Sequence, residues 1–157
     1  MRTHALLIAA LIAAPAAAAA QDTFEITFTQ HGVLGAPTGV ILLEADELEV
    51  FQCCTITLRR DLDAVAAFQS HQISLVVNRS AAGERVYDIF QHSGETLRVR
   101  ADRMVPQQSG LVYFYTDGRL IGVTNQNTAQ MVIDAGARVD QDGRPIRTAT
   151  PPVRHKR

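Results

Sequence analysis

Beyond its first twenty residues, the chain is dominated by short stretches in which apolar and polar residues alternate. The segment Thr23–Thr29 places its two phenylalanines and its isoleucine on one side, which is the period of a strand with one buried face. Glycines and a proline interrupt the pattern over His31–Gly39, so we expect a loop there and then a short apolar strand at Val40–Leu43. Alternation returns over Glu47–Leu58 and predicts one continuous strand.

The middle of the chain predicts further strands. Ile73–Asn78 and Arg85–Gln91 are expected to pair with each other around a turn at Ser80–Glu84. Thr96–Val105, in which apolar residues alternate with arginines, is expected to follow them as another strand.

The strongest local signal is the dipeptide Asp117-Gly118 between two apolar stretches. Both central residues of such a hairpin turn take positive φ angles, and Asp followed by Gly tolerates this conformation. We therefore expect a hairpin made of Leu111–Thr116 and Arg119–Thr124.

Two segments carry helix signals. Asp61–His71 opens with an aspartate that can cap a helix, and its larger apolar residues gather broadly on one side. Thr128–Ala137 fits either a short helix that ends at a glycine or one more strand, and we favour the helix. The sum predicts an α+β fold, a largely antiparallel β-sheet with one or two short helices packed on it, and no repeat of fixed period is evident.

The predicted order of strand, helix and strand over Thr55–Asn78 resembles part of the periplasmic head of the SecD export subunit. That family carries an Asp-Gly pair and an Ala-Pro pair after the helix, and neither pair follows the helix predicted here. The resemblance implies a packing unit of strand, helix and strand, and no functional residue is carried over from it.

Residues 1–20 have the features of a cleaved export signal. Arg2 and His4 give a positive start, an unbroken apolar run follows, and the alanines up to Ala20 provide a small-residue cleavage site. The apolar run is shorter than the ~20 residues that span a bilayer, so no transmembrane segment is expected. We expect the mature protein to begin at Gln21 and to be periplasmic or secreted.

The remaining length suits one domain, 21–139, before a basic, proline-containing tail, 140–157, that we expect to be disordered. One lysine beside fourteen arginines, together with the alanine-rich leader, indicates a bacterium. Over residues 21–137, fourteen Asp or Glu residues outnumber eight Arg residues, so the domain is acidic and the tail basic. An acidic domain argues against nucleic acid as the partner, because contacts to phosphate dominate that affinity.

The only two cysteines, Cys53 and Cys54, are adjacent, and export would place them where thiols are oxidised. In a regular strand, neighbouring side chains leave opposite faces, which holds adjacent sulfurs too far apart for the ~2.05 Å S–S bond. Either the strand is interrupted and a strained, reducible bond joins the neighbours, or the strand is regular and Cys54 is buried. We favour the regular strand, and the spacing of the histidines selects no metal site.

No motif for nucleophilic, metal-dependent or phosphate chemistry is found, which argues against an enzyme and predicts no cofactor. Arg98, Arg100 and Arg103 follow one predicted strand and are candidates for binding a partner, although a solvated sheet face is the simpler interpretation. The hypothesis is a noncatalytic exported binding or interaction domain, such as an envelope accessory or inhibitor protein with a protein partner. The alternative is a redox-active or metal-handling protein that uses Cys53 and Cys54.

Overall fold

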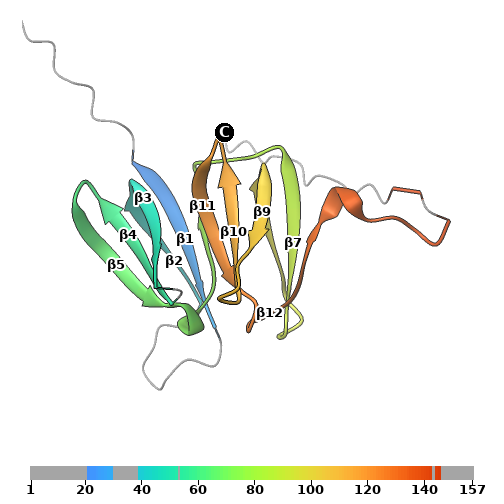
Figure 1. Ribbon diagram of the computed structural model, residues 1–157, viewed down its shortest axis with the longest axis horizontal. Helices are drawn as coiled ribbons and strands as arrows, with labels where there is room; N and C mark the ends of the chain where they lie inside the picture. Colours follow the sequence, from blue (N-terminus) through green and yellow to red (C-terminus); the bar gives the residue numbers. More distant parts are fainter. Residues whose placement is uncertain (1–20, 30–38, 53, 143, 146–157) are drawn as a thin grey trace, which may run out of the picture.

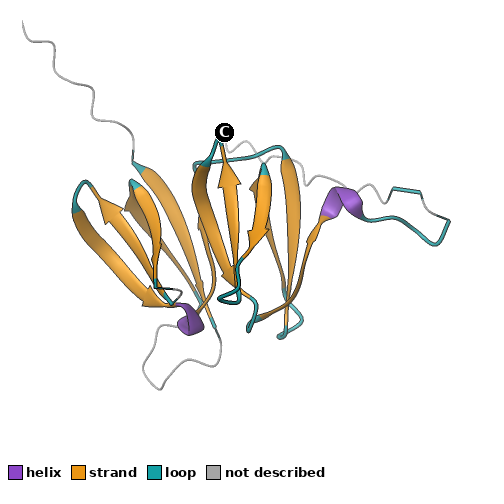
Figure 2. Cartoon of the chain, viewed as in Figure 1, coloured by secondary structure: helices purple, strands orange, loops and turns teal. Residues whose placement is uncertain are grey.

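Strands make up almost the whole of the computed structural model, which describes residues 21–29, 39–52, 54–142 and 144–145 (Figure 1, Figure 2). Of these residues 66% lie in strands and 5% in helices, and no described helix reaches seven residues. The predicted α+β fold is therefore wrong, because no helix packs on a sheet. The export signal, the loop residues 30–38 and the tail beyond residue 145 lie outside the described residues. No described helix is long and apolar enough to cross a membrane.

The described strands fall into two groups of six. The first group is β1 (Asp22–Phe28), β2 (Val40–Ala45), β3 (Glu47–Phe51), β4 (Thr55–Arg60), β5 (Asp63–Gln69) and β6 (Ile73–Asn78). The second group is β7 (Arg85–Gln91), β8 (Thr96–Ala101), β9 (Arg103–Pro106), β10 (Leu111–Thr116), β11 (Arg119–Asn125) and β12 (Ala129–Asp134). Two single turns of 3₁₀ helix, η1 (Ser70–Gln72) and η2 (Ala135–Ala137), follow β5 and β12.

These strands form three sheets, and every pairing is antiparallel. The central sheet has the order β2-β1-β6-β11-β10-β9, the N-terminal sheet β3-β4-β5, and the C-terminal sheet β12-β7-β8. One apolar core joins the central and N-terminal sheets, and a second core joins the central and C-terminal sheets. Strand β6 serves both, because Val76 lies in the first core while its neighbours Leu75 and Val77 lie in the second.

The second group of strands repeats the first. Strand β2 begins at Val40 and β8 begins 56 residues later at Thr96, and the same shift relates β3 to β9, β4 to β10, β5 to β11 and β6 to β12. The pairings also match, since β1 pairs with β2 and β6 as β7 pairs with β8 and β12. We call β1–β6 the N-terminal repeat and β7–β12 the C-terminal repeat. The expectation that the chain has no repeat of fixed period is therefore wrong.

Each repeat passes from one layer to the other through a single aspartate. In the C-terminal repeat Asp102 lies between β8 and β9, its N–H donates to the carbonyl of Tyr115 at 2.8 Å, and its Oδ2 accepts from the N–H of Asp117 at 2.9 Å. The corresponding bonds in the N-terminal repeat are Asp46 N–H to the Arg59 carbonyl at 2.7 Å and Asp61 N–H to Asp46 Oδ2 at 2.7 Å. The bent strands β2–β3 and β8–β9 thus close one side of each repeat.

The helix predicted at Asp61–His71 is wrong. Asp61 and Leu62 form the turn between β4 and β5, with Asp61 at a φ of 55°, and the chain continues as a strand to Gln69. Strand β5 supplies backbone partners to β4, which a helix would leave unpaired. A helix of about three turns would also be marginal by itself. The order of strand, helix and strand on which the likeness to SecD depends is therefore absent.

The helix favoured for Thr128–Ala137 is also wrong, because β12 pairs with β7 over this segment. Only the single turn η2 follows, and the side chain of Asp134 accepts a hydrogen bond from the N–H of Gly136 at 2.9 Å. The alternation of the segment, which includes exposed Met131, suits a strand that has one layer beneath it.

Two predicted strands are interrupted. The stretch Glu47–Leu58 is two strands, β3 and β4, joined by a turn in which Gln52 has a φ of 44°. The stretch Thr96–Val105 bends at Asp102, where the chain leaves the C-terminal sheet and enters the central one. In both cases alternation continues across the interruption, so the pattern alone does not show it.

The hairpin at Asp117-Gly118 is confirmed, with φ angles of 51° and 76° at the two turn residues. The strands Ile73–Asn78 and Arg85–Gln91 are confirmed with the predicted bounds, but they do not pair with each other. Strand β6 pairs with β1 and β11 instead, because the connection from β6 leads into the next repeat.

Candidate interaction site

The two repeats are joined by the antiparallel pairing of β6 with β11, which we call the inter-repeat interface. Gly122 lies opposite Val77, and Val123 lies opposite Val76. A Cβ atom on Gly122 would come within 2.9 Å of the Val76 carbonyl oxygen, so glycine permits the close approach of the two backbones here.

Polar side chains fix the register of this interface. The hydroxyl of Thr124 donates to the carbonyl of Ser74 at 2.6 Å, and the side-chain amide of Asn125 donates to the carbonyl of Ser70 at 2.7 Å. Both donors are buried, so loss of either bond would leave a buried polar group unpaired.

An ion pair stands at the other end of the same interface. Nη1 of Arg119, at the start of β11, lies 2.8 Å from Oδ2 of Asp22, at the start of β1. The same guanidinium group also donates to the backbone carbonyl of Asp46. Arg119 therefore ties the C-terminal repeat to two points of the N-terminal repeat.

The interface uses one edge of each repeat and leaves two others open. The equivalent strands, β5 in the N-terminal repeat and β12 in the C-terminal repeat, have no strand partner on their outer edges among the described residues. Strand β5 lies at one end of the long axis of the molecule and β12 at the other (Figure 1). The open edges therefore face away from each other.

Exposure follows from this arrangement. All residues of β6 are buried, whereas in the equivalent strand β12 only Ala129 is buried and Met131 is 49% exposed. In the same way β11 is buried from Ile121 to Asn125, whereas Val65 in β5 is 41% exposed. The open edges are thus built like the paired ones but lack a covering strand.

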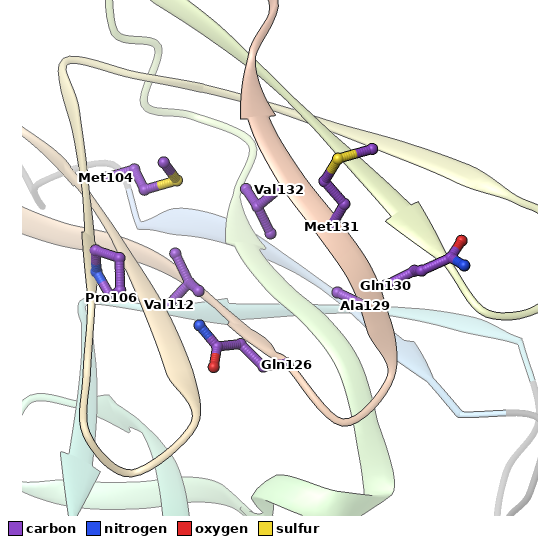
Figure 3. A pocket seen from close by; sticks show the side chains of 8 residues that line it. All are labelled: Met104, Pro106, Val112, Gln126, Ala129, Gln130, Met131 and Val132. Atoms are coloured by element: carbon purple, nitrogen blue, oxygen red, sulfur yellow. The ribbon is translucent and has the colours of Figure 1, made fainter.

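A cavity of about 270 Å³ lies beside β12 (Figure 3). It is lined by Met104, Pro106, Val112, Gln126, Ala129, Gln130, Met131 and Val132, none of which is ionisable. In Figure 3 Val132 points toward Met104 and Pro106, whereas Met131 points to the opposite side of the strand. The β12 edge and this cavity form what we call the β12 site.

The equivalent place in the N-terminal repeat is filled. The counterparts of Met104 and Val112 are Leu48 and Ile56, which are 4% and 0% exposed and belong to the first core. Leu111 and Val123 of the C-terminal repeat complete that core. The cavity therefore lies where side chains of a following repeat would pack.

The structure does not bring the three candidate arginines together. Nε of Arg98 lies 2.8 Å from Oδ1 of Asp88, a carboxylate that is buried and also faces Arg138 at 3.7 Å. Arg100 is exposed on the same strand. Arg103 belongs to β9 in the central sheet, where its guanidinium carbon lies 4.6 Å from the centre of the Tyr115 ring. Of the candidates, Arg98 is already neutralised within the fold.

Cys54 lies exposed at the end of the turn between β3 and β4, and its N–H donates to the Phe51 carbonyl at 3.1 Å. The favoured burial of Cys54 in a regular strand is therefore wrong, because the strand is interrupted at Gln52. Cys53 lies outside the described residues. Whether the two sulfurs are bonded, and with it the redox alternative, stays a prediction.

A second cavity of about 320 Å³ is polar. It is lined by Thr29, Ser74, Gln91, His92, Ser93, Asn127 and Thr128. Its single ionisable group is His92, and no group of three or more potential metal ligands occurs in the described part of the chain. The polar cavity therefore offers hydrogen bonds rather than paired acid and base groups.

No family model, curated protein or solved structure matches this chain. The β12 site was missed by the sequence analysis, because the segment that forms it was assigned to a helix. The available signal was the recurrence of Ala-Asp at residues 45–46 and 101–102 and of Asp61 at Asp117, all separated by 56 residues.

Proposed function

We propose that the protein is a noncatalytic binding protein of the periplasm or cell exterior that captures a protein strand at its β12 site. The observation that carries this proposal is an unpaired apolar strand edge beside an unfilled apolar cavity. The acidic domain and the leader sequence support an exported protein with a protein partner rather than a nucleic acid partner.

Strand addition explains how such a site would bind. The outer N–H and C=O groups of β12 would bond to an incoming strand and supply affinity, while the cavity beside Val132 would select its side chains. Natural proteins usually protect open edges with lysine, proline or a short length, and β12 has six residues with no lysine or proline. An unprotected edge of this kind indicates a partner.

The test is retention of envelope proteins on immobilised, purified protein. Wild type is expected to retain a partner in stoichiometric amount, and Met131→Lys should retain at least ten-fold less, because a charge at the edge opposes pairing. The matched control is Leu42→Lys, which places lysine at a residue of β2 that is 61% exposed. Equal retention by wild type and Met131→Lys, or no retained protein, would contradict the proposal.

A further inference from the structure

We propose that the strand captured at the β12 site is β5 of a second copy of this chain, so that copies associate head to tail. This inference rests on the proposed function, because it names the partner of the same site. It follows from the internal repeat: β12 is equivalent to β6 and β5 to β11, so the missing contact has its template inside the molecule.

The template gives the register. Shifting the inter-repeat pairs by 56 residues places Ala66 opposite Ile133, Ala67 opposite Val132 and Phe68 opposite Met131. The bulge in β5 does not prevent this pairing, because the register shift at Leu58 recurs at Phe114, and β11 pairs with β6 beyond it.

The ion pair at the interface recurs with its charges exchanged. Arg119 and Asp22 lie 2.8 Å apart in the inter-repeat interface, and their counterparts are Asp63 and Arg85. Opposite charges would therefore meet between copies as they do within one. Both groups are accessible, since Asp63 is exposed and the Arg85 side chain is 63% exposed beside Asp134.

The buried amide bond also has a counterpart. Asn125 donates to the Ser70 carbonyl within the molecule, and the equivalent residues are Gln69 and Gln126. Gln69 is exposed and carries the same amide group on a longer side chain. Its amide can therefore donate to the Gln126 carbonyl of the neighbouring copy.

Side-chain size sets the strength of the contact. Leu111 and Val123 fill the first core within the molecule, whereas their counterparts on the β5 side are Thr55 and Ala67. Ala66 also stands where Gly122 permits close approach. The contact between copies thus buries less apolar surface than the internal one, and we expect reversible association.

Net charge favours the same orientation. The N-terminal repeat, residues 22–78, has eight Asp or Glu residues and two Arg residues. Residues 79–157 have eight Asp or Glu residues and twelve Arg or Lys residues. Head-to-tail contact brings the acidic end of one copy to the basic end of the next, and attraction between them is screened by salt.

Because β5 and β12 are different surfaces at opposite ends, the contact is heterologous. Each copy that binds leaves one β12 edge and one β5 edge open, so association continues into chains unless a ring closes. This polarity distinguishes the proposal from a two-fold dimer, in which one surface meets itself.

The experiment uses purified wild type and two variants that each block one edge, Ala67→Lys and Met131→Lys. Both sites are exposed, so the variants should keep the circular dichroism spectrum and the urea midpoint of wild type. Sedimentation velocity of wild type and of Leu42→Lys should show species larger than a monomer that grow with concentration. Each blocked variant alone should stay monomeric, because every contact would include a lysine.

An equimolar mixture of the two blocked variants should give a dimer and nothing larger, since only one unblocked β12 and one unblocked β5 remain per pair. A monomeric wild type at all concentrations, or a mixture that stays monomeric, would overturn the proposal. If either variant unfolds, the concentration series of wild type decides. If self-association fails while envelope proteins are still retained through Met131, the proposed function survives with a different partner.

Discussion

Single residues fix the corners of this fold. Asp102 illustrates how, because the N–H groups of Asp117 and Glu84 both donate to its carboxylate, at 2.9 and 3.1 Å. These two bonds, that from Asp117 first, lower the pKa of Asp102 below its ordinary value of 3.8. One side chain thereby connects the bend between two sheets to the next hairpin and to the segment that enters the repeat.

The lowered pKa of Asp102 gives a prediction with a definite sign. A carboxylate whose pKa is lower in the folded state stabilises the fold above its unfolded pKa, and this stabilisation is lost as the pH falls through the lowered value. Asp102→Asn should therefore unfold at lower urea concentration than wild type near neutral pH, and the difference should shrink in acid. Asp142→Asn, at an exposed position, is the control. A difference that is constant with pH would contradict the assignment.

At the scale of elements, the pairing of strands overrides local sequence preference. Asp61–His71 has an acceptable helix pattern, yet β4 offers an edge along which this segment pairs, and burial of Phe68 against the first core follows. The hairpin at Asp117-Gly118 was predictable because its signal lies within two residues. The partners of β6 were not, since they depend on a strand more than forty residues away.

The exchanged ion pair predicts a charge-reversal effect at the strand edges. Asp63→Arg should weaken self-association by about ten-fold or less, because a pair near the surface contributes at most about 1 kcal/mol. Arg85→Asp should do the same, and the double variant should recover part of the loss. Sedimentation equilibrium at low salt gives the association constants. Purely additive losses in the double variant would show that these two residues do not meet.

At the scale of the whole molecule, the repeat determines both the fold and the candidate site. Between residues 40–78 and 96–134 only five equivalent positions are identical. They are Ala45 and Ala101, Asp46 and Asp102, Gln52 and Gln108, Asp61 and Asp117, and Val76 and Val132. Alternating apolar residues can exchange freely between such repeats, so most of the similarity lies in backbone geometry. The sequence thus predicted many strands, but not the open β12 edge.

The central claim, that β12 of one copy pairs with β5 of the next in the register of the internal interface, is tested most directly by a disulfide between copies. Ala67→Cys and Val132→Cys are made separately, each with Cys53 and Cys54 changed to serine. Antiparallel partners directly opposite have Cα atoms about 4.5 or 5.5 Å apart, within disulfide range. We expect a linked dimer only in the mixture, and much less linkage when Asp63→Cys replaces Ala67→Cys. No linkage in the mixture, or equal linkage at Asp63, would contradict the account.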